Sequence, residues 1–298
     1  MTAPAAARAG LWPALALTLN AFVWGVSWWP LRQLEAAGLH PLVATVLIYL
    51  LAVAVITLWH PGAWRELVSH PALWVIVLAS GTTNAAFNWA VTIGDVVRVV
   101  LLFYLMPLWA VLLARLLLKE RLTSLALLRV ALALGGALVI LWPAGGGWPL
   151  PRTLPEALGI LGGFAFALNN VMLRRETARA QSSRALAMFC GGTLVAGLLA
   201  LLLRTQGVLP SIPAVATGWV LGALGLGLMF LVGNLALQYG ATRLPANATA
   251  VIMLTEVLFA SVSALALGAG TLDARLALGG AAIVGAALLA AREHGAAG

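Results

Sequence analysis

The chain has 298 residues, of which 62% are hydrophobic and 9% are charged, and its mean hydropathy is +1.02. Soluble domains are about 45–50% apolar and about 25% charged, so this composition excludes soluble globular, disordered and fibrous proteins and predicts a polytopic membrane protein. The net charge of +8 comes from Arg and Lys residues spread over short connecting segments, which indicates a membrane-topology signal and no nucleic-acid partner. Cys190 is the single cysteine, so no disulfide can form within the chain.

Ten apolar runs follow one another along the chain, and a membrane-spanning helix takes about 20 residues. We expect an all-α integral membrane protein with ten transmembrane helices, at residues 11–31, 41–59, 72–93, 97–118, 123–142, 154–174, 184–204, 215–240, 245–268 and 274–291. The first run is expected to be a membrane helix and not a cleaved signal peptide. Three prolines are expected to kink or end helices, namely Pro30, Pro107 and Pro245.

Ten spans would place both termini on one side of the membrane. Twelve Lys and Arg residues then fall on the side of the termini, and five fall on the other side: Arg32, Arg98, Arg152, Arg204 and Arg275. Because cytoplasmic loops carry an excess of Lys and Arg, this distribution predicts cytoplasmic termini in an inner (plasma) membrane. An odd number of spans would change the tally.

The two halves of the chain contain matching segments in the same order. They are Trp24 to Arg32 with Phe166 to Arg174; Gly81, Asn88 and Gly94 with Gly227, Asn234 and Gly240; Met106 to Ala110 with Glu256 to Ala260; and Gly135 with Gly285. A unit of five spans is odd, so a second copy must enter the membrane from the opposite side, as in the inverted repeats of many secondary transporters. We expect a first five-helix repeat over residues 1–143, a connector over 144–155 and a second, inverted five-helix repeat over 156–298.

Short motifs resemble the EamA branch of the drug/metabolite transporter superfamily. Residues 118–123, Leu-Lys-Glu-Arg-Leu-Thr, resemble its LGERLT signature, with Lys119 in place of the usual Gly. Residues 256–260, Glu-Val-Leu-Phe-Ala, resemble its EPVFA segment, with Val257 in place of Pro, and Trp24-Gly25 resembles the Trp-Gly of its first helix. The overall pattern looks most like the YddG-type aromatic amino acid exporters. The resemblance implies a ten-helix inner-membrane carrier with a central cavity and leaves the cargo open.

Glu256 is the acidic residue that lies well inside an expected span. A charge at that depth costs roughly 2.5–3.5 kcal/mol on insertion scales, so the carboxyl must be protonated, paired or facing a water-filled cavity. Two interpretations stay open. In the functional interpretation, the Glu256 carboxylate binds a substrate amine or carries a coupling proton. In the structural interpretation, Glu256 is a protonated carboxyl that hydrogen-bonds a neighbouring helix.

Amide side chains form the second candidate set. A single amide is explained by a hydrogen bond between helices, at about 0.6–2 kcal/mol, whereas the whole set indicates a neutral hydrogen-bonding cavity. Asn84 and Asn88 are four residues apart and share one helix face. Trp24 and Trp28, with Ser27 beside them, either wall a cavity for a flat aromatic or cationic solute or pack against lipid and other helices. The residues expected at the cavity are Asn20, Trp24, Ser27, Trp28, Asn84, Asn88, Tyr104, Asn169, Asn170, Asn234, Gln238 and Glu256.

The predicted function is secondary transport: export of small amphipathic metabolites, above all aromatic amino acids, by alternating access through the central cavity. The expected partners are a small-molecule substrate and the lipid bilayer, with the protein acting as a monomer. Alternative cargoes are cationic drugs, other metabolites, and sugars or nucleotide sugars; a nucleotide sugar would call for deep Arg or Lys residues, and the basic residues lie at span ends. A membrane enzyme or sensor would need a catalytic cluster or an appended domain. The four His residues lie in loops or the tail and no phosphate-binding glycine loop precedes a Lys, so we expect no catalytic residue, metal or cofactor.

Overall fold

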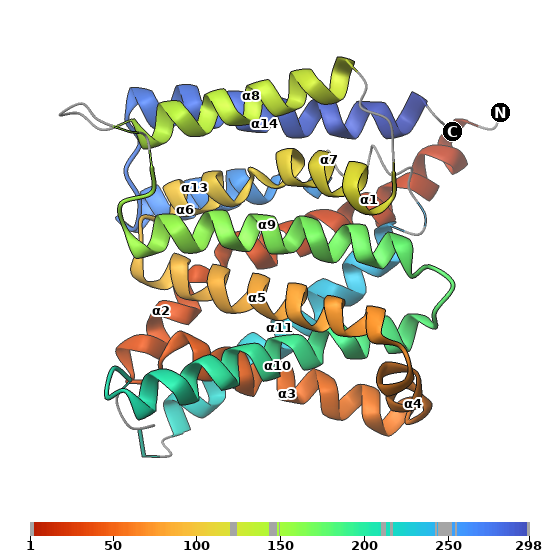
Figure 1. Ribbon diagram of the computed structural model, residues 1–298, viewed down its shortest axis with the longest axis vertical. Helices are drawn as coiled ribbons and strands as arrows, with labels where there is room; N and C mark the ends of the chain where they lie inside the picture. Colours follow the sequence, from red (N-terminus) through yellow and green to blue (C-terminus); the bar gives the residue numbers. More distant parts are fainter. Residues whose placement is uncertain are drawn as a thin grey trace.

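The computed structural model describes residues 3–119, 124–142, 148, 150–209, 213–214, 217–241, 243, 252–253 and 255–296. Within these ranges the chain forms helices joined by turns and has no β-strand, which confirms the expected all-α class. Figure 1 shows the helices running side by side, stacked from α8 and α14 at one end of the long axis to α3 and α4 at the other. The start of α1 and the end of α14 lie on the same side of this stack.

The helices follow the expected apolar runs closely. The first part of the chain forms α1 (Ala3–Val26), α2 (Trp28–Ala36), α3 (Pro41–Trp59), α4 (Gly62–Ser69), α5 (Pro71–Ile93), α6 (Val96–Phe103), α7 (Met106–Leu117) and α8 (Ser124–Leu141). The second part forms α9 (Leu154–Arg175), α10 (Gln181–Thr205), α11 (Thr217–Ala241), α13 (Thr255–Ala266) and α14 (Ala274–Ala296). Helix α4 is short and occupies a segment that the sequence indicated as a break.

Among the described residues, six segments are long and apolar enough to cross a membrane: Leu11–Ala36, Pro41–Trp59, Val96–Leu117, Leu154–Arg175, Gln181–Thr205 and Gly218–Leu237. Shorter apolar helices cover Val130–Leu141, Thr255–Ala266 and Ala274–Ala286. The outer faces of the helices are apolar as well: Trp59, Leu116 and Leu278 are 78%, 73% and 69% exposed. Large apolar patches of this kind are unusual on soluble monomers and suit helices that face lipid. The expected number of ten spans stays a prediction.

Two of the expected spans are each interrupted by a proline, the first close to its end and the second near its middle. Proline has no amide N–H, so the carbonyl four residues before it loses its helical partner. The residues four positions before Pro30 and Pro107 are Val26 and Phe103, which are the last residues of α1 and α6. Residues 11–31 therefore divide between α1 and α2, and residues 97–118 divide between α6 and α7. Pro245 lies outside the described residues.

Helices from the two halves of the sequence interleave. Helix α5 packs between α9 and α10, α1 packs against α11 and α13, and α3 packs against α10 and α11. Helices α6 and α7 pack on α9, α6 also contacts α13, and α8 lies along α14 (Figure 1). The centre of the bundle is therefore built from both halves.

The crossing of α8 and α14 depends on glycine. A Cβ at Gly136 would lie 2.5 Å from the carbonyl oxygen of Gly279, and a Cβ at Gly279 would lie 2.6 Å from that of Gly136. Small residues allow such close backbone approach between membrane helices. Both glycines belong to one identical hexapeptide, Leu-Ala-Leu-Gly-Gly-Ala, at residues 132–137 and 276–281. Gly285, which the sequence matched to Gly135, lies six positions beyond Gly279 on α14, and that match stays a prediction.

Candidate functional site

A row of aromatic rings crosses the centre of the bundle. Trp24 of α1 stacks on Phe230 of α11, with ring centroids 4.5 Å apart, and meets Phe87 of α5 edge-on at 6.4 Å. Phe87 contacts Phe103 of α6 at 4.8 Å, and Phe103 contacts Phe166 of α9 at 5.5 Å. We call these five residues the aromatic row. It joins five helices and lies next to both proline breaks, since Phe103 ends α6 and Trp24 precedes the end of α1 by two residues.

Glu256 lies beside the aromatic row, in the first turn of α13. Its carboxylate Oε2 accepts a hydrogen bond of 3.2 Å from the hydroxyl of Tyr104, a buried residue whose ring is 6.2 Å from that of Phe103. Helix α13 approaches α1 closely at Gly25, where a Cβ would lie 2.9 Å from the carbonyl oxygen of Glu256. Within the described part of the chain, Glu256 forms no ion pair. The geometry therefore offers a half-buried acid that accepts a hydrogen bond from Tyr104, whose ring contacts the aromatic row at Phe103.

Asn84 and Asn88 connect α5 to α3. The Tyr49 hydroxyl donates to Oδ1 of Asn84, whose Nδ2 donates to the carbonyl of Ser80 at 2.8 Å. Nδ2 of Asn88 donates to Oγ1 of Thr45 at 3.0 Å. The sequence left two interpretations for these amides, a hydrogen bond between helices and the lining of a polar cavity. The contacts of Asn84 with Tyr49 and of Asn88 with Thr45 are hydrogen bonds between helices.

Three buried amide oxygens have no hydrogen-bond partner among the described residues: Oδ1 of Asn20, Asn88 and Asn169. They lie on α1, α5 and α9. Asn20 has one weak contact, from Nδ2 to Sδ of Met253 at 3.5 Å. Buried acceptors are nearly always paired with protein or water, so these oxygens are candidates to accept hydrogen bonds from a polar solute or from solvent.

Trp28 and Ser27 are engaged in structural contacts. Because α1 ends at Val26, Trp24 and Trp28 lie on either side of the break at Ser27 and belong to different helices. Nε1 of Trp28 donates to Oγ of Ser263 in α13 at 3.0 Å. The Ser27 hydroxyl donates to the carbonyl of Trp24 at 2.8 Å, which satisfies an acceptor at the end of α1.

The remaining expected site residues differ in position. Asn170 is exposed on α9, apart from the buried amides. Asn234 is half-buried on α11 and has an interaction partner. The side chain of Gln238 lies outside what the structure describes. The described residues contain no group of three His, Cys, Asp or Glu side chains that could hold a metal ion.

The phenylalanines of the aromatic row and Tyr49 were not expected from the sequence. A small pocket, with room for roughly one water molecule, lies beside the row between α3, α10 and α11. It is bordered by Tyr49, Phe189, Gly227 and Phe230. One sequence signal pointed to the row: Phe166 stands 142 positions after Trp24, at the matching place in the second half.

Comparisons with known proteins agree with the membrane-carrier prediction over part of the chain. Residues 11–142 match the EamA-like transporter family. A Pseudomonas aeruginosa protein named "Uncharacterized transporter PA0485" is 43% identical over 90 residues, which cover 29% of this chain and 30% of that protein. The match thus spans less than a third of that relative. A solved structure described as "Crystal structure of protein" is 22% identical, covers 93% of this chain and 98% of its own, and has a TM-score of 0.53, which indicates a shared fold.

Proposed function

We propose that this chain is an EamA-like secondary transporter that moves small amphipathic solutes across a membrane through the region between its two halves. One observation carries the proposal. The Glu256 carboxylate, without an ion-pair partner among the described residues, lies beside the aromatic row at the junction of α1, α6 and α13. Aromatic faces and a carboxylate together suit a solute with an apolar ring and an amine.

The pattern of helix contacts supports a duplicated architecture. Under the proposed repeat, α1 corresponds to α9, α3 to α10, α5 to α11, α6 and α7 to α13, and α8 to α14. Exchanging each helix for its counterpart converts the pair α5–α9 into α11–α1, α5–α10 into α11–α3, and α6–α9 into α13–α1, and each of these pairs is in contact. Such exchange is the property of two units related by a pseudo-twofold axis, which we propose for residues 1–143 and 156–298.

We infer that the cargo is an aromatic amino acid or a related amine, as in the YddG-type exporters. Its ring would stack along Trp24 and Phe230, its ammonium group would face Glu256, and the amide oxygens of Asn20 and Asn169 would accept further hydrogen bonds. A hydrophobic cation is the second candidate, because Glu256 has no cationic partner in the described part of the chain.

Alternating access would use the two proline breaks. They interrupt backbone hydrogen bonding next to the aromatic row, and such interruptions are tolerated in membrane helices where other groups satisfy the freed carbonyls. The start of α1 and the end of α14 lie on one side of the bundle (Figure 1), which supports an even number of spans. The excess of Lys and Arg on that side supports cytoplasmic termini, and we propose an inner membrane and a monomer as the transporting unit.

The first test is transport by purified protein in liposomes. Labelled tryptophan, phenylalanine and threonine are followed with and without a pH gradient, and we expect saturable flux of the two aromatic amino acids above that of threonine. Trp24→Leu removes the stack on Phe230 and should lower tryptophan flux about tenfold. Trp59→Leu is the matched control, because Trp59 is 78% exposed at the end of α3, and its flux should be unchanged.

If none of the three amino acids moves, the amino acid assignment is wrong and a hydrophobic cation is tested in the same liposomes. If the protein moves neither class, the transporter proposal is wrong.

The role of Glu256 is tested by Glu256→Gln. If Glu256 carries a coupling proton, the variant should lose gradient-driven accumulation and keep counterflow. If Glu256 only binds the substrate amine, both should fall together. Tyr104→Phe is the control, because it removes the hydrogen bond and keeps the carboxylate. Unchanged accumulation in Glu256→Gln would leave a structural carboxyl as the explanation.

A further inference from the structure

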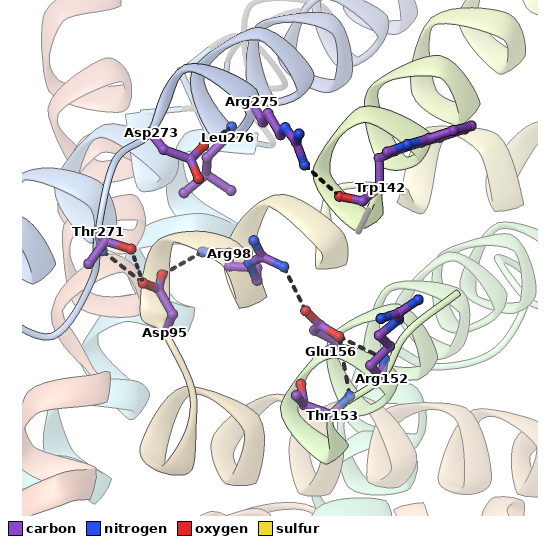
Figure 2. A network of polar contacts seen from close by, with 10 residues as sticks. All are labelled: Asp95, Arg98, Trp142, Arg152, Thr153, Glu156, Thr271, Asp273, Arg275 and Leu276. Atoms are coloured by element: carbon purple, nitrogen blue, oxygen red, sulfur yellow. Dashed lines mark hydrogen bonds and ion pairs between the residues drawn. The ribbon is translucent and has the colours of Figure 1, made fainter. Parts of the chain in front are cut away.

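The turn between α5 and α6 is fastened to the second half of the chain by polar contacts (Figure 2). Asp95 accepts the backbone N–H of Arg98 at 2.9 Å and so caps α6. Its second oxygen accepts the backbone N–H and the hydroxyl of Thr271, at 2.7 and 3.1 Å. The backbone N–H of Val96 also donates to the carbonyl of Ala269 at 3.2 Å. Helix α6 is thereby tied to the turn before α14.

A second tie joins α6 to the start of α9. Nη1 of Arg98 lies 2.7 Å from Oε1 of Glu156, and the side chain of Glu156 is 10% exposed. The other carboxylate oxygen of Glu156 accepts the backbone N–H groups of Arg152 and Thr153, at 2.9 and 3.2 Å. The carboxylate is therefore fixed by its own helix start and presents one oxygen to Arg98. Hydrogen bonds of this charged, partly buried kind are stronger than neutral ones.

The proposed repeat provides a counterpart for this end of the bundle. Gly94 packs on Pro155, where a Cβ at Gly94 would overlap the proline ring. Their counterparts, Gly240 and Pro13, are also in contact, since a Cβ at Gly240 would lie 2.7 Å from the carbonyl oxygen of Pro13. A glycine therefore lies close to the matching proline residue at both ends.

The charged residues that form these contacts are not repeated at the other end. The counterparts of Asp95, Arg98 and Glu156 are Ala241, Leu244 and Ala14. Within residues 242–249, which match α6, the charged residue is Arg243, and its guanidinium lies over the ring of Tyr239 in α11. The first acidic residue of the chain is Glu35, so α1 has no acid with which to form the counterpart of the Arg98–Glu156 pair.

We infer that Asp95, Arg98, Glu156 and Thr271 form a polar latch that holds this end of the bundle closed and biases the protein toward the state that is open at the opposite end. The inference rests on the proposed function, because alternating access requires each end to open in turn. Opening this end separates α6 from α9 and from the 269–271 segment. It must therefore break the Arg98–Glu156 ion pair and the contacts from Asp95 to Thr271, while both helix caps stay intact. Opening the counterpart end separates Gly240 of α11 from Pro13 of α1, and the position on α1 that matches Glu156 is Ala14.

The latch is tested by thiol labelling in lipid nanodiscs, where both faces of the protein are accessible to a charged, water-soluble reagent. In a Cys190→Ala background, Val99→Cys reports on the latch end, because Val99 is buried against Gly159 of α9 next to Arg98. Leu17→Cys reports on the counterpart end, because Leu17 is buried against Gly240.

Two variants release the latch while keeping both helix caps. Arg98→Gln removes the ion pair, and Thr271→Val removes the hydroxyl contact with Asp95. We expect each to raise the labelling rate of Val99→Cys, by about tenfold for Arg98→Gln, and to lower the rate of Leu17→Cys or leave it unchanged. Arg204→Gln, an equal charge change on the exposed end of α10, should alter neither rate.

A parallel rise at both probes would mean general loosening and would overturn the latch, as would unchanged labelling of Val99→Cys in both variants. Labelling and flux also separate the two proposals. If the latch variants change the labelling rates but the protein transports nothing, the latch is supported and the transporter proposal is wrong. If the protein transports solute but the latch variants leave both labelling rates unchanged, the transporter proposal is supported and the latch is wrong.

Discussion

The turn after α5 and the turn after α11 are built alike in their packing and differently in their charges. At both, a glycine lies against a proline residue of a helix from the other half. Gly94 meets Pro155 at the start of α9, and Gly240 meets Pro13 inside α1. Around the first pair, Asp95 and Arg98 tie α6 to α9 and to the turn before α14. Around the second, the matching positions hold Ala and Leu.

This difference shows that helix packing and polar contacts make distinct contributions at the two ends. Glycine at a crossing sets how closely two helices can approach, which any duplicated bundle needs at both ends. Ion pairs and caps determine how much free energy is needed to part the helices at a given end. Under the proposed duplication, the packing makes the two ends equivalent and the polar residues make them unequal, so the direction in which the bundle prefers to open is encoded in few side chains.

The largest effect is expected where the two ends are alike. Gly94→Leu and Gly240→Leu each place a side chain in space held by the partner helix, and each should lower the free energy of unfolding by about 3 kcal/mol. Gly218→Leu is the control on α11, because a Cβ there meets nothing within 4 Å. Thermal unfolding in detergent measures all three. A large loss at only one end, or an equal loss in the control, would contradict the shared packing contact.

A smaller effect is expected where the ends differ, and α9 allows the comparison within one helix. Glu156→Ala removes a capping box and the ion pair to Arg98, and we expect a loss of about 2 kcal/mol. Glu176→Ala, at the other end of α9, removes longer contacts of 3.5 and 3.8 Å to Arg179 and Arg175, and should lose less than about 1 kcal/mol.

Chemical denaturation of both glutamate variants gives the comparison directly. Equal losses would mean that the cap and ion pair at Glu156 add nothing beyond a loose ion pair. The latch would then have no energetic basis.

The sequence was sufficient for the features that local chemistry determines. Apolar runs gave the positions of most helices, with α3 at the expected residues 41–59, and the lack of an amide N–H at Pro30 and Pro107 gave the two breaks. Glu256 was identified because a carboxylate inside an apolar run has few explanations.

Features that depend on which helices pack together could not be predicted from local sequence. Phe87 and Phe103 have no polar atom that distinguishes a cavity wall from packing, so the aromatic row needed the fold. The break at Ser27, which separates Trp24 from Trp28, changed a supposed single face into contacts with two different helices. Arg98 was counted only as a topology signal, because its partner Glu156 is 58 positions away.

The smallest effect is expected at His40, which caps α3 at the same end as the latch. Its Nδ1 accepts the backbone N–H of Leu42 at 3.2 Å, and its ring lies edge-on to Trp89 with centroids 5.3 Å apart. Burial lowers the pKa of His40 below its ordinary value of 6.5. Helix α10, the proposed counterpart of α3, begins after Ala180, which makes no side-chain cap. Protonation of one histidine should therefore weaken the start of α3 and leave that of α10 unaffected.

The sign follows from proton linkage. A histidine whose pKa is lower in the folded state binds fewer protons there, so its contribution to stability is present above the unfolded pKa and is lost as the pH falls through the folded pKa. His40→Asn keeps a good capping residue and removes the titration. Between pH 7.5 and pH 5, the unaltered protein should lose about 2 °C more in Tm than the variant. If the unaltered protein and His40→Asn lose the same amount of Tm, other groups cause the acid sensitivity. The cap of α3 would then depend on pH no more than the uncapped start of α10 does.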